Sequence, residues 1–277
     1  MPFHLNTTLI PESALVLDLS QPVSPKSPHI PGAQPAYQMT LWTTADRTIS
    51  ALKRNGVVNE PGVNVELVNM TFHVGTHVDA LGHFSCGACM HGGRTTDDTV
   101  GSLALRDLDA AQIPMTITRA ILLDLSGLDG GSYLEGGRPI TAQDIEETIA
   151  KNDVALAPGD IVVIHTGWGR FYDDRRSSYA SSCPGITLEA ARYLTDHKVF
   201  AIGSDTMAVE VVPGVDPTVV MPVHIHTLVD CGVYLIENLR TEELAQQGVM
   251  IFTLVMLPLN LKGATASPVR PLAIIQK

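Results

Sequence analysis

Short apolar runs alternate with amphipathic segments along most of the chain. Strands are predicted at Ala120–Leu125 and in the runs DIVVIHTGW (160–168), VFAIGSD (199–205), VYLIE (233–237) and VMIFTLVML (249–257). Between them, Thr141 with Asp144 resembles a capping box that opens a helix, and Thr187 starts a second helix. A third helix is predicted over Val223–Cys231, stopped by Gly232, and a fourth over 241–247. Strands that alternate with helices in this way predict the α/β class with a mixed sheet.

The N-terminal region has a different pattern. A short strand is predicted at Ala14–Leu19, and seven of the eighteen prolines fall before residue 36. Such a segment cannot be helical, so we expect residues 1–36 to form a Pro-rich arm that packs across a neighbouring surface or a subunit partner. No repeat or low-complexity linker is visible, and residues 1–277 are therefore expected to form a single domain.

A second alternating segment, VNVELVNMTFH, runs from Val63 to His73. Its apolar positions change phase between Leu67 and Val68, which predicts a strand with a bulge at that point.

Composition narrows the range of partners. The chain is 45% hydrophobic and 17% charged, with a net charge of −11, so it should repel phosphate backbones and anionic lipid surfaces. We therefore expect neither nucleic acid nor a membrane as a partner. The N-terminus lacks a basic and apolar leader, and the most apolar stretch, GVMIFTLVMLPLNL, is too short to cross a bilayer, which predicts a cytoplasmic protein.

The four cysteines are too few and too scattered to predict a disulfide framework. Cys86 and Cys89 have CxxC spacing, which allows a redox or a zinc role. Without a second pair the motif is weak, and a thioredoxin-like function would require it at a strand-to-helix junction. We therefore do not expect a catalytic thiol.

The chemistry is concentrated in the stretch FHVGTHVDALGHFS, where His73, His77, Asp79 and His83 fall within eleven positions. A continuous strand would spread these four side chains over about 33 Å, and the residues around Gly75 are poor helix formers. The four groups can share a site only if the chain turns sharply, and glycine permits such a turn. We therefore predict that a strand ends near His73 and that a tight loop follows, wrapped around an ion.

Imidazole and carboxylate ligands suit Zn²⁺, Mn²⁺ or Fe²⁺ better than Ca²⁺ or Mg²⁺. Two histidines and one aspartate with an open position are typical of a catalytic site. His83, set apart by the turn at Gly82, is then placed to take and return a proton, and the alternative is that His83 is itself a ligand.

The motif HVGTHVDALGH resembles the HxGTHxDxPxH signature of the metal-dependent cyclase-like hydrolases, which include kynurenine formamidases, isatin hydrolases and trans-dienelactone hydrolases. The similarity extends from LDLSQPVSP through GDIVVIHTGW and AIGSDT to PVHIHTLVDCGVYLIENL. It implies a cyclase-like swivelling β/α/β fold and assembly into homodimers or homotetramers. The signature proline is replaced by Leu81, so the resemblance does not specify the substrate.

The resemblance also implies residue roles. His73, His77 and Asp79 would bind metal, and His83 would transfer protons. A second ion would be completed by His224 and Glu237, and Glu237 attracts attention independently because it ends an apolar strand, where an unpaired carboxylate is costly. His226 is the alternative to His224, and Asp205 is a weaker candidate for orienting a ligand histidine.

The sequence thus predicts a hydrolase that depends on Zn²⁺ or Mn²⁺, with one or two ions per chain. It would open the amide or formamide carbonyl of a small molecule with metal-bound hydroxide and with His83 as proton shuttle. The alternatives are a lactone or ester hydrolase, or a catalytically idle metal-binding protein of the same fold.

Overall fold

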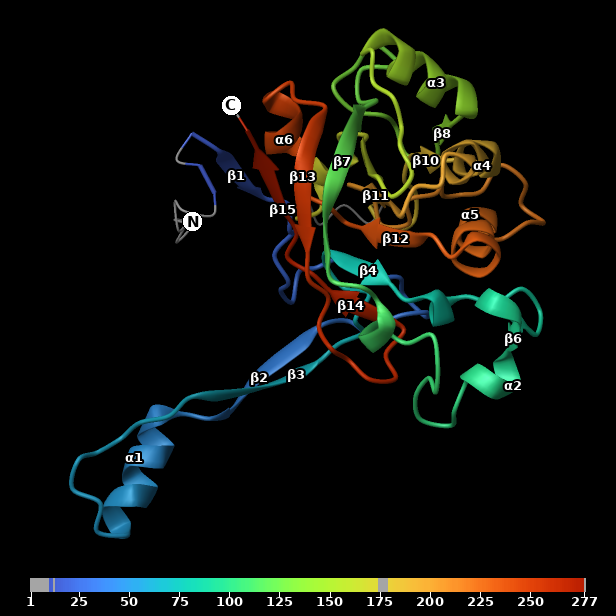
Figure 1. Cartoon of the computed structure of the whole chain (residues 1–277). Helices are drawn as coiled ribbons and strands as arrows, with labels where there is room; N and C mark the ends of the chain where they lie inside the picture. Colours follow the sequence, from blue (N-terminus) through green and yellow to red (C-terminus); the bar gives the residue numbers. More distant parts are fainter. Residues whose placement is uncertain (1–9, 12, 174–178, 277) are drawn as a thin grey trace.

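A nine-stranded mixed sheet forms the centre of the molecule (Figure 1). The computed structural model describes residues 10–11, 13–173 and 179–276. In spatial order the strands are β1 (Leu15–Asp18), β15 (Leu272–Ile275), β13 (Ile251–Met256), β7 (Thr116–Asp124), β9 (Ile161–His165), β11 (Ala201–Ser204), β12 (Tyr234–Glu237), β4 (His77–Asp79) and β14 (Ala266–Pro268). The four strands β7, β9, β11 and β12 are parallel, and the strands on either side of them pair antiparallel. The predicted α/β class with a mixed sheet is confirmed.

The central strands are buried on both faces, which explains why their sequences are continuously apolar. In β9, Val162 and Ile164 face one hydrophobic core, whereas Ile161 and Val163 face the other. Helices α3 (Ala142–Lys151), α4 (Leu188–Asp196) and α5 (Pro222–His224) lie together on one side of the sheet in Figure 1, and α6 (Glu242–Gln246) packs on the opposite core through Leu244.

The predicted helix boundaries are confirmed where capping residues define them. The Thr141 side chain accepts from the Asp144 backbone N–H, and the Asp144 carboxylate accepts from the Thr141 backbone N–H, so the capping box is complete. The helix that begins at Pro222 continues from α5 into the π-helix η5 (Ile225–Cys231) and ends at Gly232, whose φ of 69° is left-handed.

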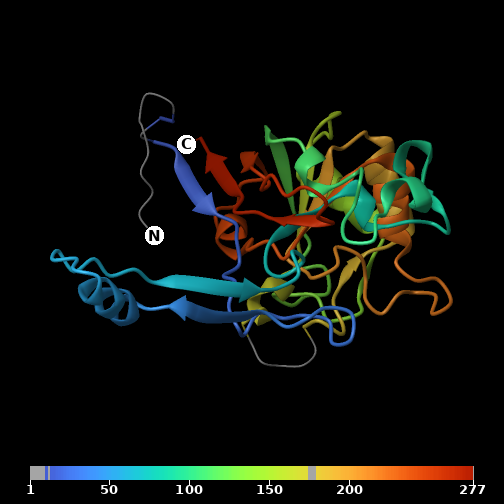
Figure 2. The same ribbon diagram turned by 90° about the horizontal axis from the view of Figure 1, so that it is seen from below.

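The described part of the Pro-rich segment packs against the body of its own chain. Residues 20–36 run along their own chain, where the Gln21 backbone N–H donates to Thr76 Oγ1 at 2.8 Å and Ser20 forms a bridge with Leu239. A hairpin of β2 (Gln38–Thr43) and β3 (Val65–Asn69), with α1 (Ala45–Arg54) at its tip, extends away from the sheet instead (Figures 1 and 2). The Pro-rich arm expected over residues 1–36 is therefore seen only in part. Its described residues pack on their own chain, residues 1–9 and 12 lie outside the described residues, and a contact of the arm with a subunit partner stays a prediction.

The hairpin also corrects the interpretation of Val63–His73. Strand β3 ends at Asn69, four residues before His73, and has no bulge at Leu67–Val68. The irregularity lies in β2, where Leu41 pairs with Glu66 and Thr43 with Val65, so Trp42 is the extra residue. The change of phase in the apolar positions therefore does not mark a bulge. Every residue of β3 is exposed, so these positions do not define a buried face of the strand.

Short elements connect the larger ones: η1 (Leu81–His83), β5 (Cys89–Met90), η2 (His91–Gly93), β6 (Arg94–Thr95), α2 (Thr96–Thr99), η3 (Ala110–Gln112), β8 (Pro139–Ile140), η4 (Trp168–Phe171) and β10 (Gly185–Ile186). Within the residues that the structure describes, no helix combines the length and apolarity needed to cross a bilayer.

Candidate metal centre

His77 and Asp79 lie two residues apart on β4 and therefore on the same face of the sheet. Both side chains are fully buried, and Val78 between them points into the opposite core. The sharp turn that the sequence predicts occurs before this strand, at Gly75, where φ is 72° and an added Cβ would lie 2.6 Å from Val23. The predicted loop after His73 is thus a turn followed by a short strand, because β4 is paired on both sides by β12 and β14.

Glu237 is placed opposite His77 by the pairing of β12 with β4. Residues directly opposite in an antiparallel pair have side chains on the same face. The His77 Nε2 atom lies 3.3 Å from Glu237 Oε2 and 3.5 Å from Asp79 Oδ1. The buried carboxylate that ends an apolar strand is therefore matched with an imidazole and a second carboxylate.

His224 reaches the same centre from α5. Its Nε2 atom lies 3.2 Å from Glu237 Oε1 and 3.8 Å from Asp79 Oδ2. His226, two residues further along, is directed elsewhere, since its Nε2 forms a 2.9 Å hydrogen bond with Thr195 Oγ1 on α4. Of the two histidines that the sequence left open, only His224 lies in the cluster.

His73 and His83 occupy the other side of Asp79. His73 Nδ1 lies 3.0 Å from Asp79 Oδ1, and His73 Nε2 forms a hydrogen bond of 2.9 Å with Thr265 Oγ1. The imidazole rings of His73 and His83 are 4.1 Å apart between centroids, and the His83 and His224 rings are 6.3 Å apart.

Five of the six side chains, all except His224, form two potential ligand groups that share one residue. The first contains His73, Asp79 and His83, and the second contains His77, Asp79 and Glu237, with the ligand atoms of each group within 4.8 Å of one another. In this grouping Asp79 belongs to both potential ligand sets, and His83 is a member of the first.

The electrostatics of the cluster favour added positive charge. Burial by itself lowers the pKa of the His77 and His224 imidazoles. The neighbouring carboxylates outweigh this effect and raise the pKa to about 9 for His77 and to about 10 for His224. Burial also opposes ionisation of Asp79 and Glu237, and the surrounding imidazoles nevertheless hold the pKa of both carboxyl groups below their usual range. Two carboxylates thus lie buried side by side, where a cation is strongly stabilised.

His83 has a different environment. Burial lowers its pKa to about 4, with the His73 and His224 imidazoles adding to the fall and the Asp79 carboxylate opposing it. A neutral imidazole offers a lone pair, which is the form required of a ligand or a proton acceptor.

The residues present fit a metal ion. In the described part of the chain, His77 Nε2 and both carboxylate oxygens of Asp79 are buried and form no hydrogen bond of good geometry, although Glu237 Oε2 lies 3.3 Å from His77 Nε2 and His73 Nδ1 lies 3.0 Å from Asp79 Oδ1. The Nδ1 atom of His77 lies 2.8 Å from the Gly75 carbonyl oxygen, to which it can donate, so in the neutral ring Nε2 carries the lone pair that a metal ion needs. Buried polar atoms without partners cost free energy, and one bound cation would satisfy all three.

Sequence reasoning missed Glu210, which is buried behind His224. Its Oε1 atom accepts from the His224 backbone N–H at 3.0 Å and lies 2.5 Å from His224 Nδ1, from which it can also accept. This contact directs Nε2 of His224 toward Glu237. The sequence did contain a signal for it, namely a carboxylate within an apolar run. Glu210 stands in MAVEVV, as Glu237 does in VYLIE. Thr265, whose hydroxyl bonds to His73 Nε2, carries no such signal in the sequence.

Replacing Glu210 with glutamine should weaken metal binding by about 10- to 100-fold, because the charge that orients His224 is lost. The measurement is competition for the ion with a chromophoric chelator. Glu189→Gln is the matched control, since Glu189 is exposed on the neighbouring α4. Equal affinities in the two variants would contradict the orienting role.

Asp205 does not orient any histidine of the cluster. Its carboxylate accepts from the backbone N–H groups of Thr166 and Gly167 at 3.0 and 2.8 Å and lies 3.3 Å from His165 Nδ1. Asp205 therefore fixes the loop after β9, and the role considered for it from the sequence is wrong.

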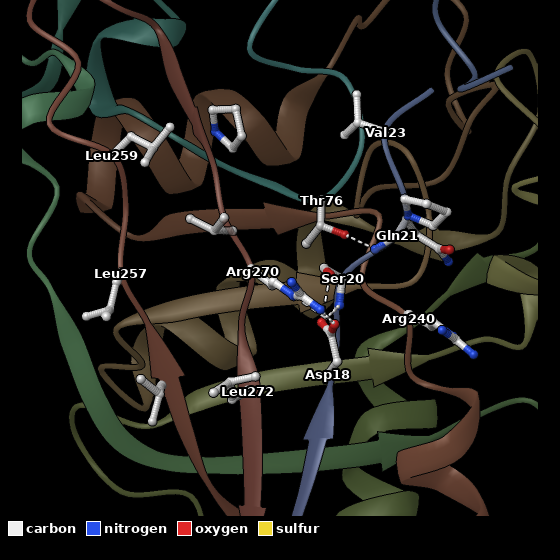
Figure 3. A pocket seen from close by; sticks show the side chains of 14 residues that line it. Asp18, Ser20, Gln21, Val23, Thr76, Arg240, Leu257, Leu259, Arg270 and Leu272 are labelled. Carbon is white, nitrogen blue, oxygen red and sulfur yellow. Dashed lines mark hydrogen bonds and ion pairs between the residues drawn. The ribbon is translucent and has the colours of Figure 1, made fainter. Parts of the chain in front are cut away.

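A groove of about 680 Å³ lies apart from the histidines, over β1, β13 and β15. Figure 3 shows its apolar floor, which includes Leu257 and Leu272, and the ion pair between Arg270 and Asp18 at 2.6 Å. None of the described residues that line it belongs to the six-residue cluster. The groove therefore does not expose the candidate metal ligands.

Comparison with known proteins identifies relatives that match most of the chain. A sequence model of the family described as putative cyclase matches residues 17–211. The kynurenine formamidase of Geobacillus thermodenitrificans is 27% identical over 260 residues, which covers 92% of this chain and 94% of the relative. The kynurenine formamidase of Bordetella pertussis is 27% identical over 257 residues, covering 91% and 94%.

Solved structures show the same fold. A protein described as a novel cyclase superimposes with a TM-score of 0.83 at 26% identity, covering 97% of this chain and 89% of that one. Isatin hydrolase A from Labrenzia aggregata, bound to benzyl benzoate, superimposes with a TM-score of 0.73 at 20% identity, covering 96% and 95%. The predicted cyclase-like fold is confirmed.

Proposed function

The chain belongs to the putative cyclase family and is a metal-dependent hydrolase of carbon–nitrogen bonds other than peptide bonds, and from this premise we propose that it opens the carbonyl of a small amide or formamide. The substrate class is an N-acyl arylamine or a cyclic amide. The observation that carries the proposal is the buried group of His77, Asp79 and Glu237, in which atoms of His77 and Asp79 lack hydrogen-bond partners. Relatives named kynurenine formamidase support the choice of a formamide.

We assign metal binding to His73, His77, Asp79, His224 and Glu237. Imidazole nitrogens with carboxylate oxygens suit Zn²⁺ or Mn²⁺. Because Asp79 belongs to both ligand groups, these residues would hold one or two ions.

A bound ion would supply Lewis acidity, which polarises the carbonyl and activates water at neutral pH. The remaining chemistry falls to the protein. His83 takes a proton from the attacking water and returns it to the leaving nitrogen. Phe84 lies next to it, with its ring centroid 4.8 Å from His83 and 4.7 Å from His224, so an apolar surface borders the reacting groups and limits access of bulk water.

The test is hydrolysis by the purified protein of a panel containing N-formyl arylamines, cyclic amides and lactones, combined with metal content per chain. We expect stoichiometric Zn²⁺ or Mn²⁺ and turnover of a formamide or cyclic amide. Preference for the lactones would support the ester alternative, and metal without any turnover would support an idle metal-binding protein. Absence of a stoichiometric transition metal after preparation without chelators would overturn the proposal.

We further propose that the chain forms a homodimer or homotetramer through the β2–β3 hairpin. An isolated two-stranded hairpin is marginally stable in water, yet this one leaves large apolar side chains uncovered. Trp42 is 70% exposed, Leu41 57% and Leu67 56%, and no residue of α1 is buried. A second copy of the chain would bury these side chains.

The double substitution Leu41→Asp with Leu67→Asp is expected to raise the dissociation constant of the assembly by at least about a hundredfold, because each buried leucine contributes about 1.5–3 kcal/mol. Light scattering after size exclusion measures the mass. Leu103→Asp is the control, since Leu103 is 98% exposed outside the hairpin. A wild-type protein that is monomeric at micromolar concentration would contradict this assembly.

A further inference from the structure

The CxxC motif forms a tight turn immediately after the histidine cluster. Cys86 and Cys89 exchange both backbone hydrogen bonds, at 2.9 and 3.0 Å, across the two central residues Gly87 and Ala88. Gly87 has a φ of 57°, which suits the first central position of a type II′ turn. The motif therefore lies in a hairpin turn and not at a strand-to-helix junction.

This pairing brings the two thiols within reach of each other. Opposed residues that exchange both hydrogen bonds have Cα atoms about 5.5 Å apart and side chains on the same face. That separation lies inside the range of about 4.4–6.8 Å found for disulfides. Both cysteines are free and exposed, so a small oxidant can reach them.

The turn is connected to the candidate catalytic residues. Cys86 follows Phe84 by two residues, and the Phe84 ring contacts the rings of both His83 and His224. On the other side of the turn, His91 Nδ1 lies 3.1 Å from the Val229 carbonyl oxygen on η5, the helix that continues from His224. The turn is therefore joined to Phe84 on one side and to His91 on the other. A change in its shape would reach the Phe84 ring beside the cluster and the His91 contact with η5.

Formation of a disulfide between Cys86 and Cys89 requires the turn to change shape. In a hydrogen-bonded pair the Cβ atoms are about 4.5–5.5 Å apart, whereas a disulfide holds them at about 3.8 Å. The turn must contract, and a disulfide closed under strain is readily reduced again.

We propose that Cys86 and Cys89 form a reversible intramolecular disulfide, a thiol modification site that lowers turnover at the neighbouring centre. The co-reactant is a small disulfide such as oxidised glutathione. One cysteine thiolate attacks it, releasing one thiol and leaving a mixed disulfide, and the second cysteine thiolate displaces the other thiol. The pair is oxidised by two electrons and loses two protons, and the reagent is reduced to two thiols.

The test is equilibration of the metal-loaded protein in glutathione redox buffers, followed by acid quenching, alkylation of free thiols and peptide mass analysis. We expect Cys86 and Cys89 to become protected together, in one peptide that has lost two hydrogen atoms. Cys231→Ser should behave like the wild type, and Cys86→Ser should remove the internal bond. Stable glutathione adducts, links between chains or continued alkylation of both cysteines would overturn the proposed site.

The effect on turnover rests on the proposed hydrolase function, whereas the thiol measurement does not, so the two can fail separately. We expect the oxidised protein to turn over substrate about threefold or more slowly than the reduced protein, with reversal by a dithiol. Cys86→Ser should show no difference between the two buffers. Equal turnover of fully oxidised and reduced wild type would overturn the coupling to the cluster.

Discussion

The variant His77→Ala is expected to lose its metal and to reduce kcat/KM by at least about a thousandfold, since metal-ion stabilisation of a transition state contributes several kcal/mol. His77 is fully buried, faces Glu237 across the β12–β4 pair and lies within 3.5 Å of Asp79. Alanine would leave these two carboxylates without the imidazole between them, so the thermal midpoint should fall as well.

The measurements for His77→Ala are metal content by elemental analysis and kcat/KM on the substrate found in the panel. His226→Ala is the matched control, because His226 lies on η5 two residues from His224 and is bonded to Thr195 instead. We expect the control to retain its metal. Circular dichroism separates metal loss from unfolding, and a folded His77→Ala protein with full metal content would exclude His77 as a ligand.

The second large effect is expected for His83→Ala, which should lower kcat by about 10²- to 10⁴-fold while the metal content stays unchanged. The His83 ring lies tilted beside the His73 ring, and His83 is less deeply buried than His77. A side chain that moves protons without holding the ion should leave binding of the metal intact.

Metal content decides between the two roles of His83. The structure groups His83 with His73 and Asp79 at ligand distance, so the ligand role has a geometric basis. A His83→Ala protein that loses its ion in parallel with His77→Ala would identify His83 as a ligand. Full metal content with low turnover would identify it as the proton-transfer group.

The groups of the centre were visible in the sequence to different degrees. His73, His77, Asp79 and His83 stood out because they are close in the chain and share one chemistry. Glu237 stood out because a carboxylate at the end of an apolar strand requires a partner. Glu210 carries the same signal in MAVEVV, but the sequence could not identify its partner, because the contact with His224 crosses fourteen residues.

The choice between His224 and His226 shows why spacing was insufficient. The two residues are two positions apart on one helical segment, and either could have faced the sheet. The packing of α5 and η5 against α4 fixed the orientation, with His226 bonded to Thr195 and His224 directed at Glu237. The rotation of the helix is set by how its apolar face packs against neighbouring elements, and that packing exists only in the folded protein.

By itself, the sequence determined the alternation of strands and helices, the capped ends of α3 and η5 and the short segment that carries most of the metal chemistry, because these depend on local periodicity and residue type. The tertiary structure alone decided that β4 is a strand between β12 and β14, that Glu237 lies opposite His77 and that β2 and β3 project from the body. Each of these depends on pairing between distant segments. Such pairing is governed by register and packing across the whole sheet, which no local pattern of residues records.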